Sequence, residues 1–213
     1  MTFTYESEVR TPYHTLQQAL YYEADPIKGS RFYVNAAPVS SEHEAKQVLE
    51  AATRQFPHAR HHCWALTLRS PSIARPNDDG EPSGSAGKPI LAQLQGRDLL
   101  NTMVVVSRFF GGTKLGVGGL VRAYGGAAGA ALDTAQIIQV VPKTTVQISF
   151  PYAHTSLVEA ALANLNQEPD SSKYGEQVEL SVLVEDAQVE SFIHRFREQT
   201  AHKVAVLSIQ PSS

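Results

Sequence analysis

The spacing of hydrophobic and polar residues predicts a mixed α/β first half of the chain. Apolar residues that alternate with polar ones, or that form a β-branched run, predict strands. The predicted strands lie near residues 19–22, 30–36, 62–68 and 102–106. Apolar residues that recur every three or four positions predict helices over about 42–56, 85–96 and 120–131. Residues 69–83 contain proline breakers and an Asp-Gly pair, so we expect a loop there.

A new pattern begins after residues 139–143, where Pro142 follows two valines. The predicted strands of this second half lie at about 146–150, 172–174, 178–184 and 204–207. Helical spacing predicts one helix after the first of these strands and another after the third. This order is the ferredoxin-like βαββαβ arrangement. We therefore predict an α/β (α+β) protein of two domains, residues 1–140 and residues 141–213.

Several predicted helices begin at residues that are suited to capping. A side-chain oxygen at such a position accepts a hydrogen bond from an N–H group of the first turn. The predicted caps are Ser41 with Glu44, Ser85, Ser156 with Glu159, and Asp186. Beside Ser85, we also expect Gly87 to open a helix N-terminus that receives an anion.

The composition is that of an ordinary globular protein of 213 residues, with 42% hydrophobic and 18% charged residues. The net charge of −3 excludes wholesale nucleic-acid binding and leaves only a local basic patch for it. The single cysteine, Cys63, excludes an internal disulfide and fits a reducing compartment. The apolar runs are too short to span a membrane and the N-terminus lacks signal-peptide features, so we expect a cytoplasmic protein.

The glycine-rich stretch at residues 107–126 is the strongest candidate for a binding site. It lies between a predicted strand and a predicted helix, and all of its charged residues are basic. Unpaired N–H groups at a helix N-terminus suit phosphate or another anion. The candidate binding residues are Arg108, Gly111, Gly112, Lys114, Gly116, Gly118, Gly119, Arg122 and Tyr124. The alternative is that the glycines serve only turn geometry, because neither glycine spacing with a known phosphate mechanism occurs.

Two shorter clusters of basic residues and histidines precede this stretch. Lys28 and Arg31 flank a predicted strand start, where solvated edge charges are the alternative to a binding role. His61 and His62 are adjacent in a predicted strand, so they point to opposite faces and only one can serve a given site. A buried, hydrogen-bonded histidine is the commoner alternative.

The polar segment at residues 78–89 is a further candidate. Its candidate binding residues are Asp78, Asp79, Glu81, Ser83, Ser85 and Lys88. Three carboxylates within four residues are suited to Mg²⁺ or to orienting basic groups, although turn chemistry explains them equally well. We expect these carboxylates to lie near Arg108 or Lys114 in one cleft, and we expect no metal or other cofactor.

Four motifs resemble the YigZ/IMPACT family in order and spacing, over about residues 25–210. They are Lys28-x-Ser-Arg-Phe32, Arg60-His-His-Cys63, the segment from Asp78 to Leu91, and the segment from Arg108 to Gly125. The resemblance implies an N-terminal domain like domain 2 of ribosomal protein S5. It also implies a ferredoxin-like C-terminal domain similar to the last domain of elongation factor G. The chain departs from the family pattern at Gly29, where a polar or basic residue is usual, and at Val117.

The resemblance also implies a function. Eukaryotic members resemble translation regulators that act by protein contact, and bacterial members are described as nucleic-acid binding by analogy of fold. The first hypothesis is therefore a translation-associated regulator that binds RNA, the ribosome or a translation-machinery protein through the glycine-rich cleft. In this hypothesis Phe109 and Tyr124 stack on bases.

The alternative is a small enzyme, either a metal-dependent, dipeptidase-like hydrolase or a phosphotransferase, that uses the loop at residues 78–88. The sequence shows no complete set of base, nucleophile and oxyanion donors, so binding is favoured over catalysis. A module that only binds another protein is the third hypothesis.

Overall fold

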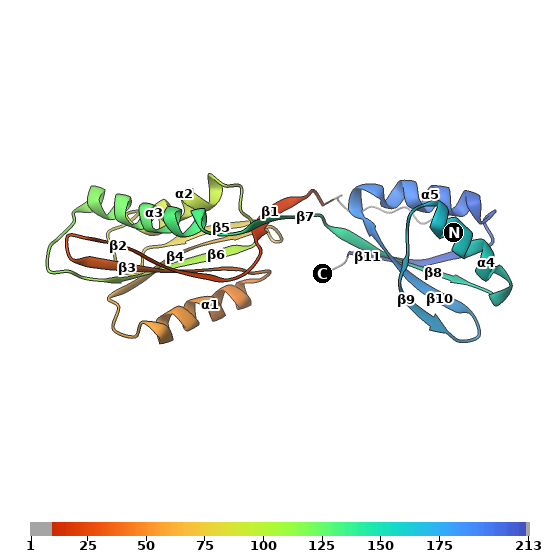
Figure 1. Ribbon diagram of the computed structural model, residues 1–213, viewed down its shortest axis with the longest axis horizontal. Helices are drawn as coiled ribbons and strands as arrows, with labels where there is room; N and C mark the ends of the chain where they lie inside the picture. The colour runs from red at the N-terminus through yellow and green to blue at the C-terminus, as the bar shows by residue number, and fades with distance from the viewer. Residues whose placement is uncertain (1–9, 212–213) are drawn as a thin grey trace. The chain divides into compact units, whose positions relative to one another are not determined.

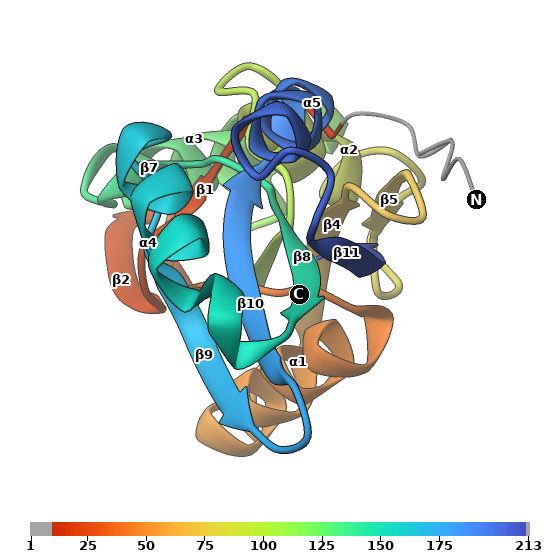
Figure 2. The same ribbon diagram turned by 90° about the vertical axis from the view of Figure 1, so that its right-hand side faces the viewer.

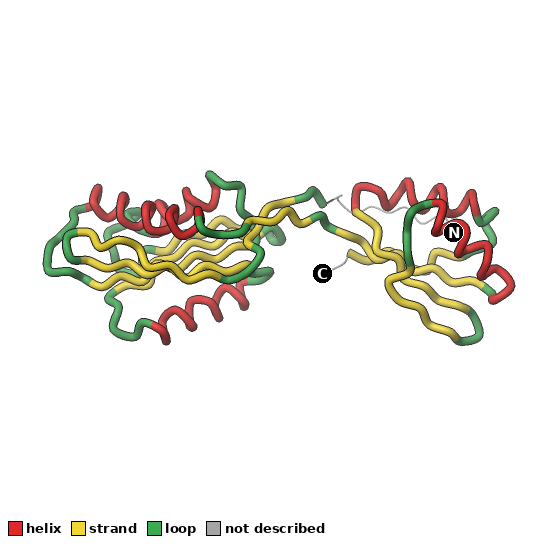
Figure 3. The backbone as a smooth tube through the Cα atoms, in the orientation of Figure 1, coloured by secondary structure: helices red, strands yellow, loops and turns green. Residues whose placement is uncertain are grey.

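A computed structural model describes residues 10–211 (Figure 1; Figure 3). The contacts divide these residues into two compact units. One unit is Tyr13–Val140, and the other combines residues 10–12 with the chain from Val141 onward. Arg10 lies with the second unit because its guanidinium Nε pairs with the Asp186 carboxylate at 2.7 Å. That residues 1–140 and 141–213 fold as separate domains stays a prediction.

The first unit is built on a five-stranded antiparallel sheet with the order β2-β3-β6-β4-β5. The strands are β2 (Leu20–Ile27), β3 (Ser30–Pro38), β4 (His61–Leu68), β5 (Ile73–Asn77) and β6 (Thr102–Phe109). In Figure 1, α1 (Glu42–Gln55) covers one face, and α2 (Gly87–Gln95) and α3 (Val117–Asp133) cover the other. The first and last strands of this unit, β1 (Tyr13–Leu16) and β7 (Ile137–Val140), form a separate antiparallel pair.

Alternation along the central strand divides the core between the two faces. Val104 and Val106 of β6 pack under α2 and α3, whereas Met103 and Val105 pack under α1. The strand is buried on both faces, which explains why valine occupies three consecutive positions, 104–106, at its centre.

The second unit has the predicted βαββαβ order. Its elements are β8 (Lys143–Phe150), α4 (Thr155–Asn164), β9 (Pro169–Tyr174), β10 (Val178–Glu185), α5 (Val189–Gln199) and β11 (Ala205–Pro211). The antiparallel sheet order β11-β8-β10-β9 completes the ferredoxin-like fold, and Figure 2 shows β9 beside β10. Two short 3-10 helices, Tyr152–His154 and Asp186–Gln188, precede α4 and α5.

Several predicted local features are wrong. Residues 69–83 are not only loop, because β5 pairs there with β4 as an edge strand, where Pro76 is tolerated. Ser156 and Glu159 form no capping box, since α4 begins at Thr155 without a side-chain cap. Asp186 does not cap α5; its carboxylate binds Arg10 and Thr144.

The cap at Ser41 is confirmed, because its hydroxyl accepts the Glu44 N–H at 3.2 Å. The Glu44 carboxylate reaches back to the Ser40 N–H and hydroxyl rather than to Ser41. Within residues 10–211, no helix is long and apolar enough to cross a membrane.

Candidate functional site

A cavity of about 480 Å³ lies in the first unit, on the face that α2 and α3 cover. It gathers the start of β4 and the residue before it, the loop before α2, the end of β6 and the start of α3. The lining residues are Arg60, His61, Gly80, Glu81, Pro82, Arg108, Phe110, Lys114, Leu115, Gly116, Val117 and Leu120. Three of the sequence motifs therefore meet here, although they lie far apart in the chain.

A buried ion pair forms one wall of this cavity. The Arg108 Nη1 donates to the Glu81 Oε1 at 2.5 Å, and the two side chains are only 6% and 5% exposed. The Tyr124 hydroxyl donates to the same oxygen at 2.9 Å. Burial raises the pKa of Tyr124, so the phenol stays a hydrogen-bond donor. These contacts fix the loop before α2 against β6 and α3.

His61 lies beside this ion pair. Its Nδ1 is 2.7 Å from the Asp79 carbonyl oxygen, and a carbonyl only accepts, so Nδ1 carries the hydrogen. In the neutral ring this leaves a lone pair on Nε2, which lies 3.9 Å from the Glu81 Oε1. The backbone around Asp79 thus orients His61 toward the cavity.

Asp78 caps the N-terminus of α2. The sequence instead predicts Ser85 as this cap, and the helix start at Gly87 as a site for an external anion. Its carboxylate accepts the N–H groups of Gly84, Ala86 and Gly87 at 2.7, 3.0 and 2.8 Å. Burial alone would raise the pKa of Asp78, but these three hydrogen bonds lower it below its ordinary value. Ser85 therefore does not cap α2, and the N-terminus of α2 already holds an anion supplied by the chain itself.

The other acidic and thiol groups of this region are also held by internal contacts. The Asp79 carboxylate accepts the His62 N–H at 2.6 Å. The Cys63 thiol donates to the Asp78 carbonyl oxygen at 3.0 Å, and burial raises its pKa to about 12. Among residues 10–211, no group of three or more His, Cys, Asp and Glu side chains is arranged to hold a metal ion.

The start of α3 differs from that of α2. Gly116 occupies the cap position with a φ of +72°, which favours glycine, and provides no side-chain cap. The first turn contains no acidic residue. The exposed side chains of Lys114 and Arg60 line the cavity beside this turn, and Phe110 is 43% exposed there. This corner therefore offers free N–H groups, two cations and an accessible ring.

Glycine is required at Gly111 for a different reason. A Cβ at this position would lie 1.8 Å from the Gly29 carbonyl carbon, so the backbone after β6 passes directly against the β2–β3 turn. The Ser30 hydroxyl accepts the Gly111 N–H at 3.2 Å and also contacts Arg108. This contact explains Gly29, because a side chain there would collide with the Gly111 carbonyl oxygen.

Several other candidate residues are not among those that line the cavity. His62 points to the α1 face, where its Nδ1 lies 2.8 Å from the Ser107 hydroxyl, as the alternation of the strand predicts. Arg31 lies on the same face over the Phe109 ring. Tyr124 is fully buried, and Phe109 packs edge-on against Tyr33 on the α1 face. Neither ring is therefore placed to stack on a base from this cavity. Outside the cavity lining are Lys28, Asp79, Ser83, Ser85, Lys88, Gly111, Gly112, Gly118, Gly119 and Arg122.

Arg60 and Phe110 are not among the binding residues that the sequence suggests. Arg60 belongs to the Arg60-His-His-Cys63 motif, and its N–H bonds the Arg108 carbonyl at 2.9 Å, which holds it at the cavity. Phe110 directly follows the last residue of β6, and this position turns its ring out of the sheet toward the cavity.

Comparisons with known proteins agree with this architecture. The family model described as Impact N-terminal domain matches residues 28–132, and a model described as a domain of unknown function matches residues 148–202. The chain is 32% identical to a solved structure titled as that of a hypothetical protein, with a TM-score of 0.68, covering 94% of this chain and 98% of the other. A structure from Thermus thermophilus at 10% identity and a TM-score of 0.50 covers 97% of this chain and 30% of the other, and shows the fold alone.

Two curated relatives match most of the chain. One is the IMPACT family member YigZ of Escherichia coli (strain K12), 34% identical over 189 residues, which are 87% of this chain and 93% of the relative. The other is the IMPACT family member YvyE of Bacillus subtilis (strain 168), 34% identical over 192 residues, which are 90% and 88%. On these matches, the chain belongs to the IMPACT family.

Proposed function

We propose that the chain is a translation-associated regulatory protein that binds single-stranded RNA at the cavity of its first unit. The observation that carries this proposal is the bare start of α3 beside two exposed cations. Free N–H groups at a helix start and basic side chains are the groups that bind phosphate oxygens. The link to translation rests on the resemblance of the sequence motifs to the family.

The charges available to a ligand are fewer than the sequence suggests. Arg108 is neutralised by Glu81, so Lys114 and Arg60 supply the free positive charge at the cavity. Phe110 supplies an exposed ring for stacking against a base, a contact worth roughly 1–3 kcal/mol. With two phosphate contacts to a single strand, a plot of the logarithm of the binding constant against the logarithm of the salt concentration should have a slope of about −1.4. Binding is therefore expected to be weak at physiological salt.

The second unit does not add a familiar RNA platform. RNA-recognition motifs, which share this βαββαβ order, bind bases through aromatic residues on the open face of the sheet. Here the open face of β10 presents Glu179, Ser181, Leu183 and Glu185, because the alternate residues pack under the helices. The proposed contacts with RNA therefore lie in the first unit.

Fluorescence anisotropy with a fluorescein-labelled single-stranded RNA, titrated over a series of salt concentrations, tests the proposal. Lys114→Ala and Arg60→Ala should each weaken binding and make the slope shallower by about 0.7. Lys46→Ala and Arg54→Ala remove matched charges from α1, on the opposite face, and should leave binding unchanged. Undetectable binding at low salt, or equal effects of all four variants, would contradict the RNA ligand and favour a protein partner.

A small hydrolase or phosphotransferase is the second candidate, and the orientation of His61 is the one observation that favours it. Its Nε2 faces the cavity as a base, but no nucleophile is paired with it among the described residues. Incubation of labelled RNA with the protein, followed by gel analysis, separates the candidates. Cleavage that disappears in His61→Ala would favour a hydrolase that acts on RNA, and intact RNA would exclude that activity.

A further inference from the structure

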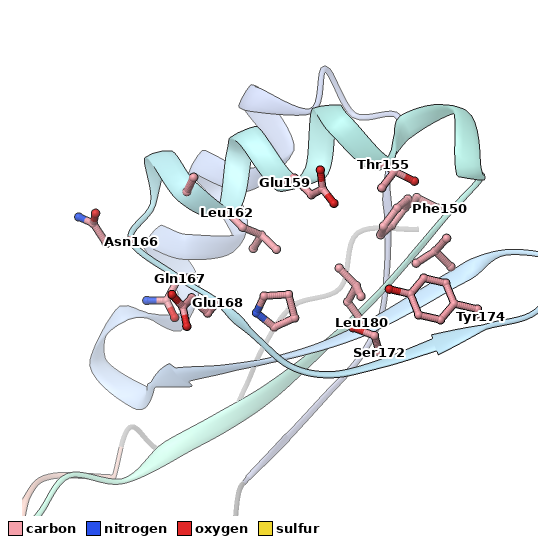
Figure 4. A pocket seen from close by; sticks show the side chains of 13 residues that line it. Phe150, Thr155, Glu159, Leu162, Asn166, Gln167, Glu168, Ser172, Tyr174 and Leu180 are labelled. Atoms are coloured by element: carbon pink, nitrogen blue, oxygen red, sulfur yellow. The ribbon is translucent and has the colours of Figure 1, made fainter.

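The second unit contains a larger hollow that none of the sequence motifs covers. Its volume is about 760 Å³, and it lies between α4, the turn that follows α4, and the strands β9 and β10. Figure 4 shows side chains of α4 and its following turn on one side and those of the strands on the other. This volume is within the range of pockets that hold a small ligand or a few side chains.

The floor of this pocket is apolar and its charges are all negative. Phe150, Leu162 and Leu180 contribute hydrophobic surface. Glu159 of α4 and Glu168 of the following turn are its only charged lining residues, and both are exposed. Neither forms an ion pair with any other residue in the described part of the chain. An apolar floor under two free carboxylates suits a cation on an apolar stem, such as an arginine or lysine side chain.

The charge of the whole region agrees with this preference. Residues 141–213 hold five Lys and Arg residues against nine Asp and Glu residues, and Arg10, which also belongs to the second unit, raises the basic count to six. Residues 1–140 as a whole hold 13 against 12. The second unit therefore attracts basic partners and repels phosphate backbones. Lys173, the one cation of β9, lies on the opposite face of the strand from Ser172 and Tyr174, which line the pocket.

The position of the pocket favours a peptide over a free amine. β9 is an edge strand, and all six of its residues are exposed. A strand at a sheet edge presents unpaired N–H and C=O groups, to which an extended peptide can add. Alternate side chains of such a peptide would lie on the same face as Ser172 and Tyr174, over the pocket. Tyr174, a residue that is 69% exposed, offers a cation–π surface at the rim.

We propose that this pocket binds an extended basic peptide segment of a partner protein, which pairs with β9 and places an arginine or lysine side chain between Glu159 and Glu168. The proposal does not depend on RNA binding by the first unit, because its residues all belong to the second unit. It assigns the two units ligands of opposite charge.

The experiment uses the full chain and a capped, fluorescein-labelled hexapeptide of alternating threonine and arginine. Glu159→Gln and Glu168→Gln should each lower the affinity about fivefold, the upper range for an exposed ion pair. Glu179→Gln removes the same charge from the open face of the same sheet and should change nothing. Ser172→Lys, which places a cation in the pocket, should abolish binding.

Two further ligands test whether binding needs both the positive charge and the peptide backbone. A peptide with citrulline in place of arginine keeps the shape but loses the charge, and it should not bind. Agmatine carries the guanidinium without a peptide backbone, and it should compete only at concentrations far above that of the peptide. Absence of binding, equal loss in the Glu179→Gln control, or equal competition by agmatine would overturn the proposal.

Discussion

The helices α2 and α3 cover the same face of one sheet, yet their first N–H groups differ in whether a side chain of the protein binds them. At α2, the Asp78 carboxylate binds the N–H groups of Ala86 and Gly87. At α3, Gly116 provides no cap and no acid follows in the first turn. Both ends carry the positive end of a helix dipole. The chain satisfies one with its own anion and leaves the other to solvent or a ligand.

Burial explains the difference. Ala86 and Gly87 are buried, so their N–H groups need a partner within the protein. Val117 and Gly118 are exposed, and water can satisfy the corresponding groups of α3. A glycine-rich loop and a helix start therefore become a binding site only where the chain has not already supplied the anion.

The largest effect should come from the ion pair that holds the loop before α2 against β6. Arg108→Met leaves the Glu81 carboxylate buried without its partner, so we expect a loss of about 3–5 kcal/mol in the free energy of unfolding. Urea denaturation measures this loss. The double variant Arg108→Met, Glu81→Gln should recover part of it, because no uncompensated charge remains. A double variant that is less stable than Arg108→Met would contradict this explanation.

The second effect concerns the cap of α2. Asp78→Ala leaves three N–H groups without their acceptor and should cost about 2–3 kcal/mol. The pKa of Asp78 is lowered in the folded protein, so its stabilisation is present above its ordinary value of 3.8 and is lost as the pH falls through the folded value. The stability gap between wild type and Asp78→Asn should therefore narrow below pH 3.8. A gap that is constant with pH would show that the charge contributes nothing.

Making α3 resemble α2 is the third test. Val117→Asp places a carboxylate at the exposed start of α3, where it should stabilise the helix by about 0.3–1 kcal/mol. The same carboxylate should weaken RNA binding, because it accepts hydrogen bonds from the backbone N–H groups of α3 that are proposed to bind phosphate and because it repels phosphate. Val117→Asn is the matched neutral variant and should weaken binding less. Equal affinities of the two variants would argue against a role for the helix start.

The smallest effect is expected from separating the two units. Limited proteolysis should cut near residues 139–143 and leave a stable fragment that contains the first unit. The contrast between α2 and α3 should survive in this fragment, because both helices belong to Tyr13–Val140. Protection of this segment equal to that of the cores would count against separate domains.

Much of the fold can be predicted from sequence because its cores follow regular spacing. One β-branched run indicates the strand β6, and one apolar stripe indicates the helix α3. The strand β5 escapes prediction because an edge strand is largely exposed and Pro76 resembles a loop signal. The sequence suggests Ser85 as the cap of α2 because a serine directly before a helix is a common cap. The acceptor is instead Asp78, which reaches the helix start from the preceding loop.

The motifs locate the candidate site, but they do not show which of its charges are free. Arg108 and Lys114 look equivalent in the sequence, and only the tertiary contact with Glu81 separates them. The assignment of the adjacent histidines to opposite faces is correct, because strand geometry determines that locally. The exposure of Phe110 and the burial of Tyr124 depend on how α3 packs, which spacing alone does not determine.

The most direct measurement is a titration of the isotope-labelled protein with inorganic phosphate, followed by amide proton–nitrogen NMR spectra. We expect the amide signals of Val117, Gly118 and Gly119 to shift in a saturable way, and to shift less in Lys114→Ala. The signals of Ala86 and Gly87, whose N–H groups bind Asp78, should stay in place. Shifts at Ala86 and Gly87, or no shift at the start of α3, would contradict the claim that α3 is the open anion site.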